Sequence, residues 1–225
     1  MVIKELYELW RKDNLLTQAL GESHEMLERT GRMFHESVRS LRHADSSDLG
    51  FDIYEEDRKV NRYEQDVRRK VLKHLAITGT TNAASGLVLV SVVIDIERVG
   101  DYTKNIVELA VAHPARLDCG KYEADTTRIE MAVAAMFHQI VPVMKQYDEA
   151  RARTLIQDSV WIRKRSDEIV VELIKGSDPS LTRGDAVAIA LYVRYLKRIG
   201  AHLMNVLSSV VNPFERIGFH VEEND

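Results

Sequence analysis

Two stretches of the chain, one hundred positions apart, read almost alike. Residues 97–110 are Glu-Arg-Val-Gly-Asp-Tyr-Thr-Lys-Asn-Ile-Val-Glu-Leu-Ala, and residues 197–210 are Lys-Arg-Ile-Gly-Ala-His-Leu-Met-Asn-Val-Leu-Ser-Ser-Val. Identical residues occupy three matching positions: Arg98/Arg198, Gly100/Gly200 and Asn105/Asn205. Such a repeat indicates two copies of one structural unit. Because the second copy has Lys197 and Ala201 in place of Glu97 and Asp101, any chemistry that needs these acids is complete in one half only.

The composition excludes several classes of protein. With 225 residues, 45% of them hydrophobic, the chain can bury a substantial core. A net charge of −4 gives no reason to expect nucleic acid as the main ligand. The single cysteine, Cys119, excludes an internal disulfide framework and cysteine-based zinc or iron–sulfur sites, and it is compatible with a reducing cytoplasm.

No segment of the sequence has the pattern of a membrane span. The amino terminus carries scattered charges and lacks the apolar core of a signal peptide. The most apolar run, 83–94, is shorter than the roughly 20 residues that cross a bilayer, and charged residues follow it at once. We therefore expect a cytoplasmic protein without direct membrane insertion, whose contact with membranes comes through a partner.

The spacing of apolar residues predicts a chain of long helices. Only 4 prolines and 11 glycines interrupt the sequence. Helices are expected at about 14–43, 49–75, 83–113, 122–147, 149–174 and 185–211, with a short leading helix at 2–12. Ser47 or Asp48 can cap the second of the long helices. A β-strand is the local alternative for 83–94 because of its β-branched residues, but the matching segment 186–196 is rich in Ala and Leu and favours a helix.

The sequence therefore predicts an all-α fold of two tandem three-helix bundles. The expected parts are an N-terminal helical extension at 1–13, a first repeat at 14–113, a linker at 114–121, a second repeat at 122–212 and a C-terminal tail at 213–225. Short loops imply antiparallel neighbours within each bundle. Trp10, in the extension, and the exposed helix faces are candidates for self-association, so a homodimer is also expected.

Acidic side chains on two helices are the candidates for chemistry. Glu97, Asp101 and Asn105 lie four apart and share one helix face directly after the most apolar run. Asp57 and Asn61 lie four apart on the preceding helix, followed by Glu64. Burying carboxylates is costly unless cations or donors compensate them. Two interpretations stay open: the acids pair with Arg98 or with basic residues of the preceding helix, or they bind a hard metal ion such as Mg, Mn or oxidised Fe.

Other motifs are weaker. The eight histidines show no metal-binding spacing, and His202 is expected to be a structural residue with its hydrogen bonds satisfied. No glycine-rich loop resembles a phosphate cradle, so nucleotide hydrolysis has no visible machinery.

The repeated motif resembles the signature of the PhoU family of phosphate-regulatory proteins. The resemblance rests on Glu97-Arg98-Val99-Gly100-Asp101 with Asn105, on the second copy from Arg194 to Asn205, and on the acidic helix with Asp57, Asn61 and Glu64, and it covers about 15–211. It implies two three-helix bundles and an accessory regulator of phosphate uptake. It also implies two kinds of partner, a phosphate transporter and the sensor histidine kinase that reports phosphate.

The resemblance further implies a metal site in the first repeat. Some members of the family bind iron or other metal clusters through paired acid motifs, which would correspond here to Asp57, Asn61, Glu97 and Asp101. Asn61 stands where the family usually has an acid. In the second repeat, aligning Val67 with Ile169 places Ser159 and Arg163 opposite Asp57 and Asn61. Together with Lys197 and Ala201 on the next helix, acids are lost and cations are gained. We therefore expect a metal-free second repeat.

These observations favour a non-enzymatic regulator that acts as an adaptor. The alternative is a metal-dependent enzyme, similar to a phosphohydrolase, that uses the acid cluster of the first repeat. The degenerate second repeat and the absence of an evident nucleophile or phosphate-binding loop weigh against it. A purely structural helical protein is the third interpretation.

Overall fold

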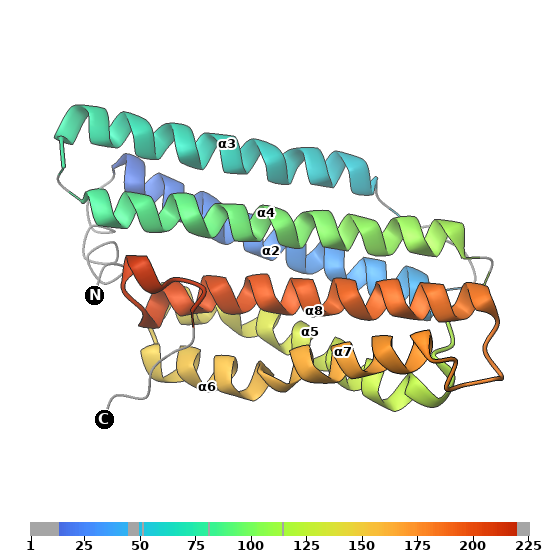
Figure 1. Ribbon diagram of the computed structural model, residues 1–225. Coiled ribbons are helices and arrows are strands. Elements are labelled where there is room, and N and C mark those ends of the chain that lie inside the picture. Colours follow the sequence, from blue (N-terminus) through green and yellow to red (C-terminus); the bar gives the residue numbers. More distant parts are fainter. Residues whose placement is uncertain (1–13, 45–49, 51, 81, 114, 220–225) are drawn as a thin grey trace, which may run out of the picture.

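The computed structural model describes residues 14–44, 50, 52–80, 82–113 and 115–219 (Figure 1). The first repeat consists of α2 (Leu15–Arg42), α3 (Ile53–Thr78) and α4 (Ala83–Ala112). The second contains a short 3-10 helix η1 (Gly120–Tyr122), then α5 (Glu123–Gln146), α6 (Glu149–Ser159), α7 (Trp161–Ile174), α8 (Arg183–Val211) and a second 3-10 helix η2 (Phe214–Arg216). The predicted helix at 2–12, with Trp10, lies outside the described residues. The all-α fold of two tandem three-helix repeats is confirmed.

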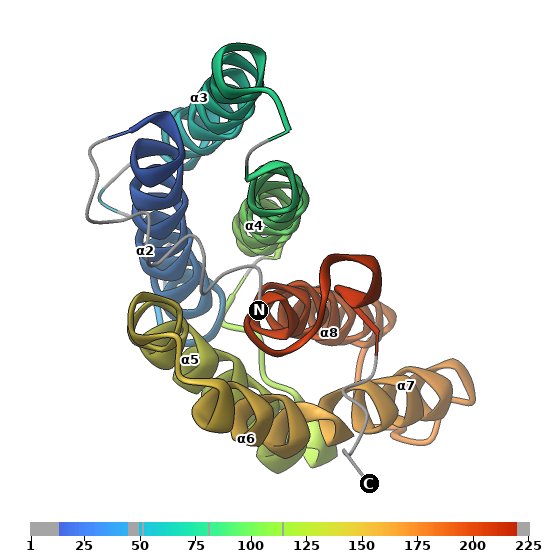
Figure 2. The same ribbon diagram turned by 90° about the vertical axis from the view of Figure 1, so that its left-hand side faces the viewer.

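The two repeats share one core. α2 packs against α4 and α5, and α8 packs against α4 and α5, so these four helices form the centre. α3 covers α2 and α4 on one side, while α6 and α7 cover α8 on the other. Viewed along the helices, α3 and α7 lie at opposite ends of the arrangement (Figure 2). The contact between α4 and α8 therefore joins one bundle to the other.

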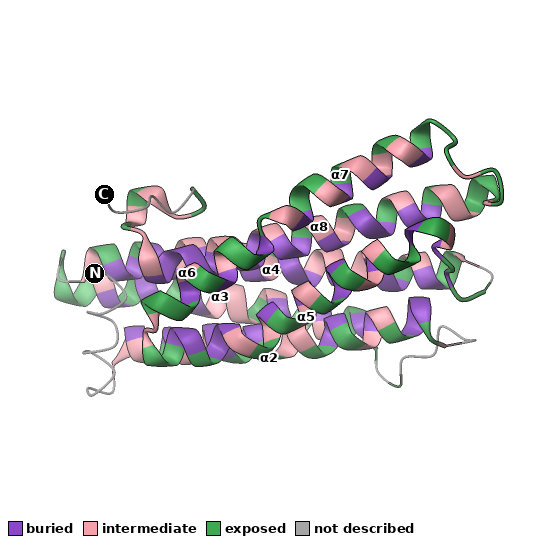
Figure 3. Cartoon of the chain, turned by 90° about the horizontal axis from the view of Figure 1, so that it is seen from below, coloured by how far each residue is buried: buried purple, intermediate pink, exposed green. Residues whose placement is uncertain are grey.

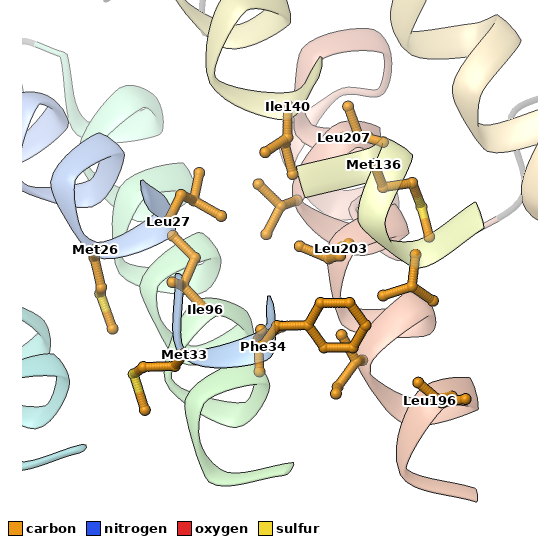
Figure 4. Close-up of a cluster of buried hydrophobic side chains, with 14 of the residues drawn as sticks. Met26, Leu27, Met33, Phe34, Ile96, Met136, Ile140, Leu196, Leu203 and Leu207 are labelled. Carbon is orange, nitrogen blue, oxygen red and sulfur yellow. The ribbon is translucent and has the colours of Figure 1, made fainter. Parts of the chain in front are cut away.

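Apolar side chains from both repeats meet in this centre. Buried positions recur along one side of each helix and exposed positions along the other (Figure 3). Leu27 and Phe34 of α2 approach Ile140 of α5 and Leu203 of α8 (Figure 4). Each of these four side chains is at most 2% exposed. Burial of this kind supplies the main driving force for folding.

The apolar run 83–94 forms the first half of α4, so the helix prediction is confirmed over the strand. Val88, Leu89, Val92 and Val93 are buried there against the other helices. Tertiary packing thus overrides the modest helix propensity of valine. None of the helices in the described part of the chain combines the length and apolarity needed to cross a bilayer.

Side-chain caps fix where several helices begin. The Asn14 carboxamide oxygen accepts hydrogen bonds from the backbone N–H groups of Leu16 and Thr17, and Thr182 and Asp185 form a reciprocal capping box at the start of α8. The predicted start of the second helix at residue 49 is wrong, because α3 begins at Ile53 with Asp52 as its cap. Ser47 and Asp48 lie outside the described residues.

The predicted single helix at 149–174 is also wrong, since it is divided into α6 and α7 (Figure 1). At the junction the Val160 N–H bonds the carbonyl of Gln157, three residues back instead of four, at 3.4 Å. This tightens the backbone for one turn. The apolar periodicity continues through the junction, with Leu155 and Ile162 both buried, and therefore gave no sign of it.

The connection between the repeats is part of the core. The Leu117 N–H donates to the carbonyl of Leu41 at 2.9 Å, and the side chains of Leu117 and Cys119 are buried. Burial raises the pKa of the Cys119 thiol to about 12, which leaves it protonated and unreactive at neutral pH.

A buried arginine of α2 links this connection to α5 and, through Glu130, to α8. Arg42, whose side chain is 3% exposed, donates to the carbonyl of Leu117 and pairs with Glu123 and Glu130 of α5. The Arg42 Nε lies 2.9 Å from Glu130, which also accepts a hydrogen bond from the Tyr192 hydroxyl of α8 at 2.8 Å. One buried cation thus serves two carboxylates in this cluster.

The start of the predicted C-terminal tail packs against α8. The Gly218 N–H donates to the Ser208 hydroxyl at 2.8 Å, and the Asn212 side chain donates to the carbonyl of Arg216 at 2.9 Å. The described part of the segment, 213–219, is thus fixed to the bundle.

Candidate functional site

The structure places the four residues of the predicted metal site on two neighbouring helices, α3 and α4. Asp57 and Asn61 lie on α3, and Glu97 and Asp101 lie on α4. The two helices approach closely at Gly100, where a Cβ atom would stand 3.3 Å from Val60 of α3. A larger residue at this position would push α3 and its acids away from α4.

A lysine lies between the two helices. The Lys104 Nζ donates to Asp57 Oδ2 at 2.9 Å and to Asp101 Oδ1 at 3.1 Å. The side chains of Lys104 and Asp57 are 20% and 12% exposed, so this ion pair is largely removed from water. Burial lowers the pKa of Lys104, but the two carboxylates outweigh that effect and hold the pKa above its ordinary value.

An arginine covers the outer side of the same acids. The Arg98 guanidinium lies 3.2 Å from Asp101 Oδ2 and 3.6 Å from Glu97 Oε2. Burial raises the pKa of Glu97, and the Asp101 carboxylate raises it further, with Arg98 opposing them. Both Asp101 oxygens therefore have a cation as partner, while Glu97 is the acid whose negative charge is least well compensated.

This arrangement does not fit a metal ion. Hard metal ions need several free carboxylate oxygens pointing at one place. Within the described residues, no group of three or more His, Cys, Asp or Glu side chains is placed to hold one. Asn61 is half-buried, and its side chain makes no hydrogen bond with any residue that the structure describes. The metal site at Asp57, Asn61, Glu97 and Asp101 stays a prediction from the sequence. The ion pairs of Arg98 with Glu97 and Asp101 agree with the alternative interpretation, in which basic side chains pair with the acids.

The second repeat has the same framework with different charges. A Cβ atom at Gly200 would lie 3.8 Å from Ile162, as one at Gly100 would meet Val60. This supports the alignment that places Ser159 and Arg163 opposite Asp57 and Asn61. Ser159 is the buried last residue of α6, and Arg163 is exposed on α7. Lys197 pairs with Asp167 across α7 and α8, while Ala201 contributes no polar group.

A polar cluster at the contact between α4 and α8 was not foreseen. Asp95 Oδ1 lies 2.7 Å from His202 Nδ1 and accepts a hydrogen bond from the Asn205 side chain at 3.0 Å. The Arg198 guanidinium lies 3.2 Å from His202 Nε2, so both ring nitrogens of His202 have a polar neighbour. His202 is thus a structural residue with both nitrogens satisfied.

The internal repeat of the sequence relates the residues of this cluster to one another. A shift of one hundred positions relates Asp95 to Tyr195 and His202 to Tyr102. Tyr102 contacts Tyr195, with ring centroids 6.1 Å apart, as Asp95 contacts His202. The positions in contact are therefore related by the pseudo-symmetry of the repeats, whereas the residues at these positions differ in chemistry.

A groove of about 1130 Å³ lies mainly between α2 and α5. Its wall carries both apolar and charged side chains, and the charged ones are largely paired, as Arg29 is with Glu56 and Lys145 with Glu28 at 3.6 Å. The groove therefore presents no concentration of one charge that would select a ligand.

Fold and site together define a class: all-α proteins of two tandem three-helix repeats that present an acidic motif between the second and third helices. The PhoU domain matches the sequence twice, at residues 24–110 and 126–210. Because these matches cover more than half of the chain, the protein belongs to the PhoU family. No curated protein matches the sequence significantly.

Two solved structures share the fold. PhoU from Pseudomonas aeruginosa superposes with a TM-score of 0.77 at 20% identity, over 88% of this chain and 95% of that one. The phosphate transport system regulatory protein PhoU from Streptococcus pneumoniae superposes with a TM-score of 0.71 at 15% identity, over 94% and 95% of the two chains. At these identities the likeness concerns the fold.

Proposed function

We propose that this protein regulates phosphate uptake and phosphate-responsive signalling as a non-enzymatic adaptor that binds a phosphate transporter or its sensor kinase. The observation that carries the proposal is the pair of PhoU domain matches, which together account for both bundles. The likeness to a protein described as a phosphate transport system regulatory protein supports the same role.

An adaptor of this kind acts by binding one conformation of its partner more tightly than another. A surface suited to such binding runs along α4 and α8 between the outer helices. Leu87 and Ile94 of α4 are 45% and 38% exposed, and Val187 and Leu191 of α8 are 60% and 37% exposed. Because α4 and α8 run antiparallel, the two pairs of side chains lie toward opposite ends of the helix pair. We name the surface that they mark the α4–α8 face. Leu87 and Val187 occupy matching positions in the two repeats, so the face offers apolar contacts from both.

The ion pairs of the acid cluster support a role without catalysis. A general base or a metal-binding carboxylate needs a free oxygen, whereas Asp101 has Arg98 on one oxygen and Lys104 on the other. Turnover of a generic phosphate ester with added Mn²⁺ or Mg²⁺ distinguishes the enzyme from the adaptor. We expect no activity that differs between the wild type and Asp101→Asn, and Asp101-dependent turnover would favour the enzyme.

The adaptor is tested by cross-linking and capture from native membranes at high and low phosphate, with the chain tagged after Asp225. We expect recovery of a phosphate transporter or its sensor kinase, in an amount that changes with phosphate. The double variant Leu87→Asp/Val187→Asp should lose that capture because it places one charge toward each end of the α4–α8 face.

The matched control is Met131→Asp, which alters an apolar side chain of α5 that is 68% exposed. This variant should keep the capture at the wild-type level. Capture that is absent at both phosphate levels would contradict the adaptor. Capture that survives the double variant would contradict the α4–α8 face as its surface.

A further inference from the structure

We propose that Lys104 supplies the cation of the acid cluster in the first repeat, so that this protein neutralises the cluster with its own side chain and without a metal ion. The ammonium group contacts one carboxylate from each helix, Asp57 of α3 and Asp101 of α4, at 2.9 and 3.1 Å. A bridging cation between the two helices is what a bound metal would otherwise provide.

The surroundings of Lys104 strengthen this interaction. The Asp57 side chain is 12% exposed and that of Lys104 is 20% exposed. Charges attract each other more strongly in such a site than in water, because less solvent screens them. A divalent cation would have to expel the ammonium group from both carboxylates, and it would then face Arg98 beside Asp101.

A comparison of the two copies supports the assignment independently. Position 204 in the second copy, which matches Lys104, is methionine. That copy also has Ser159 and Ala201 where the first has Asp57 and Asp101, so it lacks the two acids that Lys104 contacts. The lysine is therefore present in the copy with the acids and absent from the copy without them.

The substitution Lys104→Met gives the first copy the residue of the second and leaves Asp57 and Asp101 without their shared cation. Wild type, Lys104→Met and Lys104→Arg are incubated with Mn²⁺ or Fe²⁺, freed of unbound metal by gel filtration and analysed for metal per chain. We expect no retained metal in the wild type or in Lys104→Arg. We expect retained metal in Lys104→Met, and its loss when Asp101→Asn is added.

Thermal unfolding gives a second readout. Lys104→Met should unfold at a lower temperature than the wild type, and Mn²⁺ should restore part of the difference. The matched control is Lys59→Met, which removes another lysine that contacts two acids, Glu55 and Glu56 at 2.9 Å, within one helix. Neither effect is expected there, because these contacts do not join two helices.

Two results would overturn the proposal. The first is wild-type protein that retains Mn²⁺ or Fe²⁺ and loses it on Asp101→Asn. The second is folded Lys104→Met that retains none. If Lys104→Met does not fold, the wild-type measurement and Lys104→Gln decide between the same outcomes, because glutamine has no charge but can still donate a hydrogen bond. All of these measurements are independent of the adaptor and its partners.

Discussion

Arg42 shows how much one buried charge contributes at the junction of the repeats. Its guanidinium contacts Glu123, Glu130 and the carbonyl of Leu117. The substitution Arg42→Met leaves the Glu130 carboxylate buried without its cation. We expect a loss of about 3–5 kcal/mol in the free energy of unfolding, measured by urea denaturation.

The control for this prediction is Arg39→Met on the same helix. Arg39 is 44% exposed and pairs with Glu36, and such surface pairs contribute little. We expect a change within about 0.5 kcal/mol. Equal effects of the two substitutions would mean that the buried cluster does not fasten the linker.

The raised pKa of Glu97 predicts that stability falls as the pH rises above the unfolded value of this group. Its folded pKa is raised, chiefly by burial and then by Asp101. The folded state therefore binds the proton more tightly than the unfolded state, and stability falls as pH rises from about 4.3, the unfolded value, through the folded pKa. Glu97→Gln removes this term, so the variant should gain stability relative to the wild type as pH rises through that interval.

The measurement is the free energy of unfolding of both proteins between pH 4 and 8, from urea denaturation at each pH. A difference that stays constant over this range would show that the Glu97 carboxyl is not perturbed in the folded state.

Single residues of the site were only partly predictable. Arg98 was an expected partner of the acids because it neighbours them on the helix. Lys104 is three residues from Asp101, so that contact follows from helical spacing. Its contact with Asp57 depends instead on how closely α3 and α4 pack, which the periodicity of one helix does not determine.

At the scale of helices, Gly100 controls the distance between α3 and α4. A side chain there meets Val60, which is fully buried and has no room to move. We expect Gly100→Leu to destabilise the protein by about 1–3 kcal/mol by overpacking, despite the better helix propensity of leucine. Thermal or urea unfolding measures the effect.

Gly21 is the matched control, since it lies inside α2 with no heavy atom within 4 Å of an added Cβ. Gly21→Ala should stabilise the protein by about 0.5–1 kcal/mol because alanine is the better helix former. A stabilising Gly100→Leu would show that the two helices can separate without cost.

The helices were predictable where burial alone determines them. Apolar spacing identified α2, α4 and α8 to within a few residues of their ends. It placed the start of α3 too early, since the Asp52 cap depends on local hydrogen bonds. It missed the junction at Val160, where one backbone hydrogen bond reaches three residues back instead of four while the buried face continues.

For the whole molecule, the contact between α4 and α8 predicts that both repeats unfold together. In Trp10→Phe, Trp161 is the only tryptophan, and it reports on the second repeat through its position beside the Arg128 guanidinium, 4.1 Å from the ring centre. The denaturation midpoint from Trp161 fluorescence should coincide with that from far-UV circular dichroism. Adding Gly100→Leu, in the first repeat, should lower both midpoints equally. A Trp161 midpoint that does not move would mean that the repeats unfold separately.

The overall architecture was the most predictable level because the repeat specifies it twice. Two matching motifs, each preceded by apolar residues at helical spacing, are sufficient to predict two bundles in tandem. How the bundles meet was not predictable from either motif, because that contact combines Asp95 from one copy with His202 and Asn205 from the other.

The unlike pairs at this contact bear on the ancestry of the chain. A duplicated gene begins with two identical halves, and an interface between identical halves must complement itself. Here one half supplies Asp95 and Tyr102, and the other supplies Tyr195 and His202. A chain with two copies of the first half would set Asp95 against tyrosine and lose its histidine partner. Each half has thus become a dedicated partner of the other, and recombination that exchanges them would be selected against.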